Sequence, residues 1–194
     1  MTTDRELAVD PDEIASFWEL ARGRAGLARL AVVTGTGAAA SVAPPAWAFG
    51  DSPAVADELV DLVLADVKTA TVSPLWEYEA SGVDVPSVGD LSIVLDGRAH
   101  PRALIRTSAV RTARFDEVDA AHAWAEGEGD RSLESWRAEH EAYYRRLMAT
   151  RGVEFRPDME LVLEAFELRF PARPRGPGHA RSHPVGPVAP GRSQ

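Results

Sequence analysis

The sequence contains no cysteine. This absence excludes a disulfide framework, a thiolate zinc site, an iron–sulfur cluster and a cysteine nucleophile. Long hydrophobic runs are also missing, since the longest uncharged stretch, from Leu30 to Gly50, is interrupted by glycines and by Pro44–Pro45 and is not expected to span a membrane. The N-terminus is rich in Asp and Glu, unlike a secretory leader, so a cytoplasmic protein is expected.

Lysine is almost absent. Of the 21 basic residues, Lys68 is the single lysine, and all the others are arginine. Arginine replaces lysine readily where only a solvated positive charge is needed, whereas a compact ammonium with an adjustable pKa is particular to lysine. Lys68 therefore either has a chemical role or is a lysine that remains by chance in a sequence with a compositional bias toward arginine.

Basic residues are few in the main part of the chain. The net charge is −9, and positions 1–172 hold 17 basic against 30 acidic residues, while positions 173–194 hold four arginines and no acid. Binding to duplex nucleic acid requires neutralisation of many phosphates over a broad face, so a duplex DNA partner is not expected. A small ligand, or a short single strand in a local basic cleft, is compatible with this charge.

The hydrophobic pattern predicts an α+β domain with about five strands and three or four helices. Helices are expected after the Asp10–Pro11 cap, over 52–66, over 132–148 and, more briefly, over 115–125. Strands are expected over 66–72, 91–95, 98–107 with an extension over 109–115, and 159–170. The alternation of apolar residues shifts phase between Ala165 and Phe166, which indicates a β-bulge and a small sheet that curls into a barrel.

Two segments carry the residues most suited to chemistry. One runs from Lys68 to Thr71, and the other is the acidic, glycine-interleaved stretch from Glu126 to Ser132. The second is either an ordinary connection that caps the following helix, or a loop that places Glu128 at a cleft as a carboxylate able to move protons. The five histidines lack the spacing of metal ligands, and no metal or cofactor is expected.

At these segments the sequence resembles the ASCH domain family. The resemblance rests on motifs that occur in the family's order: 49–53 (FGDSP), 68–71 (KTAT), 75–79 (LWEYE), 88–90 (VGD), 126–130 (EGEGD), Trp136–Arg137 and His140. It implies a PUA-like β-barrel flanked by helices, linked to RNA and modified nucleosides. The expected organisation is an N-terminal helix and loop over 1–46, the ASCH domain over 47–171, and a disordered Pro/Gly/Arg-rich tail over 172–194.

The resemblance also implies site residues. Family members that remove the acetyl group of N4-acetylcytidine use a Lys-x-x-Thr motif and a later glutamate, which fall here on Lys68, Thr71 and Glu128, with Glu126 as the competing placement. Side chains expected to contact the substrate are Glu126, Arg131, Ser132, Trp76 and Tyr78, the aromatic ones by stacking on a base or, alternatively, as ordinary core. At Asp66–Val67 the sequence departs from the family, which has a glycine and a basic residue before the lysine.

The resulting hypothesis is an ASCH hydrolase that acts on a modified nucleoside or RNA, most concretely by amide hydrolysis of N4-acetylcytidine. Two alternatives are an RNA-binding module without turnover and a ribonuclease specific for single strands. The expected partners are therefore a nucleoside or single-stranded RNA. The oligomeric state and the role of the arginine-containing tail are not determined by these patterns.

Overall fold

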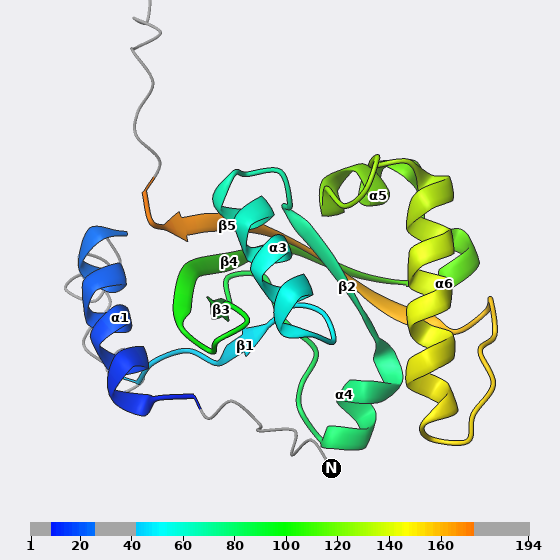
Figure 1. The fold of residues 1–194 in the computed structure, drawn as a ribbon, viewed down its shortest axis with the longest axis horizontal. Coiled ribbons are helices and arrows are strands. Elements are labelled where there is room, and N and C mark those ends of the chain that lie inside the picture. The colour runs from blue at the N-terminus through cyan, green and yellow to red at the C-terminus, as the bar shows by residue number, and fades with distance from the viewer. Residues whose placement is uncertain (1–8, 26–41, 173–194) are drawn as a thin grey trace, which may run out of the picture.

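A five-stranded mixed sheet forms the centre of the protein, as described here from a computed structural model that covers residues 9–25 and 42–172 (Figure 1). The strands are β1 (Ala46–Ala48), β2 (Ala70–Pro74), β3 (Leu91–Leu95), β4 (Pro101–Arg114) and β5 (Glu160–Phe170). Their spatial order is β1-β3-β4-β5-β2, with β1 parallel to β3 and all other pairs antiparallel. The predicted α+β class and the number of strands are confirmed.

The sheet does not close into the expected barrel. Within the described ranges β1 and β2 form its two edges and do not pair with each other. The register shift expected at Ala165–Phe166 is present, but the extra residue belongs to the opposite strand and is Ser108 of β4. A second register shift places Arg169 of β5 between two paired positions. These shifts curl the two long strands, yet two short edge strands cannot complete the circuit.

Five α-helices occur in the described part of the chain, more than the three or four expected. They are α1 (Pro11–Arg24), α3 (Pro53–Leu64), α4 (Leu75–Ser81), α5 (Ala120–Glu126) and α6 (Leu133–Ala149). The four helices expected correspond to α1, α3, α5 and α6, and the additional one is α4, of seven residues; a 3-10 turn at Phe115–Glu117 precedes α5. No helix in these ranges is long and apolar enough to cross a membrane.

Side-chain caps explain where the longer helices begin. Asp10 and Ser52 accept hydrogen bonds from backbone amides at the starts of α1 and α3, and both helices have proline at their first position. Ser132 likewise accepts a hydrogen bond from a backbone amide at the start of α6. Helix α1 packs its buried face against Ile93, Leu104 and other apolar residues of the sheet. The N-terminal helix is thus part of the same hydrophobic core as the sheet.

Two predicted features fall outside the described residues. The loop before β1 is described only from residue 42, and the arginine-containing tail only to residue 172.

Helices α5 and α6 lie together at one end of the sheet, on the side where β2 begins (Figure 1). This arrangement brings the two segments with candidate chemistry to the same place.

Candidate functional site

Lys68 lies in a short connection between α3 and β2. The chain reverses at Asp66, whose φ is 61°, and the amides of Val67 and Lys68 both donate to the carbonyl of Leu62, at 2.9 and 3.1 Å. The amide of Thr69 then donates to Ala125 of α5 at 2.8 Å. The connection is therefore fixed between two helices, and the Lys68 side chain is directed into the protein with only 1% of its surface exposed.

Gly127 allows the acidic loop to approach this connection. It ends α5 with a φ of +76°, and a Cβ at this position would lie 2.5 Å from the carbonyl oxygen of Val67. A residue with a side chain would be strained by the backbone conformation and would collide with the neighbouring segment. The glycine thus places its two neighbours, Glu126 and Glu128, on either side of the lysine.

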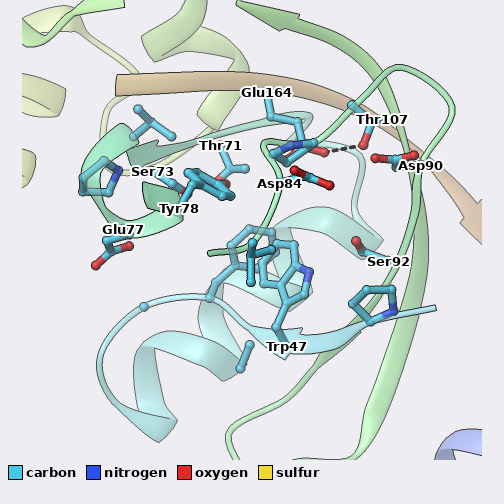
Figure 2. A pocket seen from close by; sticks show the side chains of 18 of the residues that line it. Trp47, Thr71, Ser73, Glu77, Tyr78, Asp84, Asp90, Ser92, Thr107 and Glu164 are labelled. Atoms are coloured by element: carbon cyan, nitrogen blue, oxygen red, sulfur yellow. Dashed lines mark hydrogen bonds between the residues drawn. The ribbon is translucent and has the colours of Figure 1, made fainter. Parts of the chain in front are cut away.

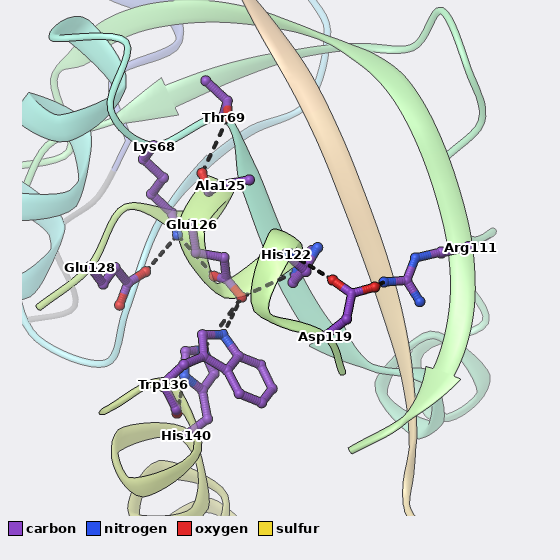
Figure 3. Close-up of polar contacts among 10 residues, drawn as sticks. All are labelled: Lys68, Thr69, Arg111, Asp119, His122, Ala125, Glu126, Glu128, Trp136 and His140. Carbon is purple, nitrogen blue, oxygen red and sulfur yellow. Dashed lines mark hydrogen bonds and ion pairs between the residues drawn. The ribbon is translucent and has the colours of Figure 1, made fainter. Parts of the chain in front are cut away.

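The three charged side chains form one ion-pair cluster (Figure 3). Lys68 Nζ donates to Glu126 Oε2 at 3.1 Å and to Glu128 Oε1 at 2.5 Å. Burial alone would lower the pKa of Lys68, but the two carboxylates outweigh burial and raise it above its usual value. Lys68 is therefore a fixed ammonium at neutral pH.

The two glutamates differ in their surroundings. Glu126 is 1% exposed, whereas the Glu128 side chain is 22% exposed. Burial would raise the pKa of Glu126, yet the charge of Lys68 and the nearby His122, whose Nε2 lies 3.3 Å from Oε1, lower it to about 2. Glu126 is an internal carboxylate that is charged at neutral pH, and Glu128 is the one that faces the solvent side.

The cluster opens into a cavity of about 280 Å³. Its lining includes Lys68, Thr71, Glu126 and Glu128, so the lysine, the threonine and both candidate glutamates share one concave site. In a regular strand the side chains of residues 68 and 71 would point to opposite faces, but β2 begins only at Ala70 and the turn before it removes this constraint. The convergence required by the sequence hypothesis is present.

Figure 2 shows a second cavity, of about 540 Å³. The two share part of their lining, with Thr71 at the boundary. The larger cavity has aromatic walls, and in the described part of the chain its lining contains no lysine or arginine. Its ionisable side chains are mostly acidic: Glu77, Asp84, Asp90 and Glu164, together with Tyr78 and Tyr143.

Glu164 is the buried member of this acidic set. It accepts a hydrogen bond of 2.5 Å from the Thr107 hydroxyl. Burial raises its pKa, the bond from Thr107 opposes this, and the charge of Asp90 raises it further. A carboxyl of this kind, in a cavity without nearby cations in its lining, favours a ligand rich in hydrogen-bond donors over a phosphate.

The remaining predicted site residues occupy different places. Tyr78 lines the larger cavity, as does Trp47. Trp76 packs against the core beside α6, under the guanidinium of Arg151, and is not part of either cavity lining. Arg131 donates to the carbonyls of Trp124 and Val67, so it braces the loop around Lys68.

Ser132 likewise does not line either cavity and caps α6. Several side chains at the site were not singled out by the sequence: Asp84, Asp90, Thr107, His122 and Glu164. Asp90 stands in one of the family motifs, which was the single available signal for it. The others are separated in sequence and meet only in the folded protein.

Comparisons with known proteins agree with this fold. An ASCH domain from Lactobacillus crispatus JV V101 is 29% identical, with a TM-score of 0.63 over 76% of this chain and 94% of that one. A protein from Enterococcus faecalis V583, assigned to the family DUF984, is 30% identical, with a TM-score of 0.66 over 82% of this chain and 91% of that one. No protein with a curated description matches. The ASCH domain family itself matches residues 45–169, and the chain therefore belongs to that family, as its motifs predicted.

Proposed function

We propose that this ASCH domain hydrolyses the amide of an N4-acylated cytidine nucleoside, with N4-acetylcytidine as the substrate to test. The observation that carries the proposal is the shared cavity, in which a buried ammonium, a hydroxyl and a partly exposed carboxylate line one space. These groups are what amide hydrolysis requires: a positive charge for the oxyanion, a nucleophile, and a group that carries a proton to the leaving amine.

In the proposed reaction, the Thr71 hydroxyl attacks the acetyl carbonyl and gives its proton to Glu128. Lys68 stabilises the negative charge that develops on the carbonyl oxygen. Glu128 then passes the proton to the N4 nitrogen as the carbon–nitrogen bond breaks, which releases cytidine and leaves an acetyl ester on Thr71. A water molecule hydrolyses the ester by the same steps, so that one water is consumed and acetate is released.

The larger cavity supports a nucleoside rather than a polymer. Four carboxylates and the walls formed by Trp47 and Tyr78 offer hydrogen-bond acceptors and stacking surfaces to a base or a sugar. The same carboxylates repel a phosphate backbone, which weighs against the two alternatives, an RNA-binding module and a ribonuclease.

The test is incubation of the 194-residue protein with N4-acetylcytidine and, separately, with single-stranded RNA, followed by chromatography of both. We expect cytidine and acetate from the first and intact RNA from the second. Cleaved RNA with intact nucleoside would instead identify a ribonuclease, and RNA retained without cleavage would identify a binding module.

Thr71 variants show whether turnover arises at this site. Thr71→Val removes the hydroxyl at constant shape and should lower the rate at least about a hundredfold, whereas Thr71→Ser should retain measurable turnover. Thr112→Val is the matched control, because Thr112 is an exposed threonine on a strand of the same sheet. Equal activity of Thr71→Val and Thr112→Val would remove Thr71 from the reaction.

A further inference from the structure

Three ring nitrogens from α5 and α6 converge on one oxygen of Glu126 (Figure 3). Trp136 Nε1 donates to Glu126 Oε1 at 2.6 Å, His122 Nε2 lies 3.3 Å from the same oxygen, and His140 Nε2 lies 3.8 Å from it. The other oxygen, Oε2, accepts from Lys68. Both oxygens of Glu126 are therefore engaged by side chains of the protein itself.

Trp136 is itself held firmly. It is 4% exposed, and its ring stacks on Phe115 at 5.3 Å and on His140 at 4.2 Å between centroids. His140 Nδ1 lies 3.0 Å from the Trp136 carbonyl oxygen, which can only accept, so this nitrogen donates. The indole N–H thus has a fixed direction, and it is aimed at the carboxylate that orients the lysine.

We propose that Glu126 and Trp136 are positioning residues, in which the indole fixes the carboxylate and the carboxylate fixes Lys68 Nζ at the cavity, while Glu128 alone moves protons. The assignment rests on the proposed function for its catalytic consequence. It differs from the sequence expectation that Glu126 contacts the substrate. Its physical basis is that a charged group aligned before the reaction stabilises a developing oxyanion without reorganisation.

Two carboxylates orient the Lys68 ammonium, and Glu126 is the one that the protein buries. The groups that face its ammonium are the carboxylates of Glu126 and Glu128, with the Phe49 ring at 5.1 Å, and Tyr144 packs beside the cluster. The two histidines face Glu126. Without the indole N–H, Glu126 Oε1 would keep only its longer contacts, to His122 at 3.3 Å and to His140 at 3.8 Å. The carboxylate would then be less restrained against rotation away from the lysine.

The experiment compares Trp136→Phe with Trp18→Phe. Both changes delete a buried indole N–H, but Trp18 Nε1 has no hydrogen-bond partner among the described residues, so its loss removes no contact. Because Lys68 is the single lysine, protein labelled with ¹⁵N-lysine gives one side-chain signal that needs no assignment. The measurements are this signal, its exchange with water, and kcat and KM for N4-acetylcytidine.

We expect wild type and Trp18→Phe to share one slowly exchanging Nζ signal. Trp136→Phe should shift it and speed its exchange, with kcat lowered about 10- to 100-fold and KM changed less than about threefold. An unchanged Lys68 signal in Trp136→Phe, or a changed signal with wild-type kcat, would overturn the proposal. If wild type does not turn over the nucleoside, the proposed function fails, and the signal comparison still decides whether the indole orients the lysine.

A second variant covers the case in which Trp136→Phe does not fold. Glu126→Gln keeps the shape of the side chain and removes the charge that Lys68 contacts. We expect the same 10- to 100-fold loss in kcat, with KM changed less than about threefold and the Lys68 signal shifted. Glu128→Gln should instead abolish turnover. A wild-type kcat, an unchanged Lys68 signal, or a loss of turnover as complete as in Glu128→Gln would overturn the assignment.

Discussion

At the residue scale, the burial of Lys68 defines the role it can play. A lysine that acts as a nucleophile or forms a Schiff base must give up its proton near neutral pH. Two carboxylates at 3.1 and 2.5 Å instead hold the pKa of Lys68 above its usual value against the effect of burial. The chemistry open to Lys68 is that of a fixed positive charge directed at a developing oxyanion.

The substitution Lys68→Arg is the direct test of this role. The planar guanidinium cannot occupy the site of a compact ammonium, so we expect turnover to fall at least about a hundredfold. Because the side chain is 1% exposed, the larger arginine should also lower the melting temperature, unlike Arg145→Lys at an exposed position. A thermal unfolding curve gives the melting temperature, and a chromatographic assay of the nucleoside gives turnover. Retention of most activity in Lys68→Arg would show that any positive charge suffices at this position and would contradict the role assigned to the compact ammonium.

Glu126 makes the stability of the protein dependent on acid. Its pKa is about 2 in the folded protein and is expected near 4.5 in the unfolded chain, so its stabilising effect is complete above about pH 4.5 and is lost as the pH falls toward 2. Urea unfolding of wild type and Glu126→Gln between pH 6 and 2 measures this. We expect the free energy of unfolding to fall more steeply with acid in wild type, and parallel curves would contradict the assigned pKa.

At the element scale, the approach of the α5 C-terminus to the α3–β2 connection builds the site. Gly127→Ala tests this approach, with Gly82→Ala as the matched control. Both glycines have a left-handed backbone, but a Cβ at Gly82 meets nothing within 4 Å, whereas one at Gly127 meets the Val67 carbonyl at 2.5 Å.

Gly82→Ala should cost about 1 kcal/mol of stability, the usual cost of a left-handed alanine. We expect Gly127→Ala to cost more and also to lower kcat, because the clash pushes both glutamates away from Lys68. Stability by denaturant titration and activity by nucleoside turnover give the comparison. Equal costs and equal activity in the two variants would show that the close approach does not matter to the site.

At the scale of the whole molecule, we expect charge to select the ligand. The chain has a net charge of −9, and the larger cavity adds a local group of carboxylates. We expect N4-acetylcytidine to be used with a lower KM than its 5′-monophosphate, and the difference to shrink as salt is added, because screening weakens the repulsion. Asp84→Asn should also reduce the difference in KM between the nucleoside and its 5′-monophosphate. A lower KM for the nucleotide would place a phosphate-binding site outside these cavities.

The sequence by itself determined the local elements and the family. Helix starts at Asp10, Ser52 and Ser132 follow from side-chain caps that lie within three residues of the amides they satisfy. The strand 91–95, and most of the strand 101–114 that was expected over 98–107 with an extension over 109–115, follow from the pattern of apolar residues. The ASCH motifs then identified the family and drew attention to Lys68, because such motifs are short and continuous in the chain.

Only the tertiary structure decided which of the two glutamates is buried. Glu126 and Glu128 are two residues apart and chemically identical, and their difference in burial arises from Trp136, His122 and His140, which the fold brings to one of them. The acidic cavity and the open sheet have the same origin, since strands distant in sequence pair with shifts in register that local patterns do not specify. Local propensity depends on neighbours along the chain, whereas burial and charge at a site depend on neighbours in space.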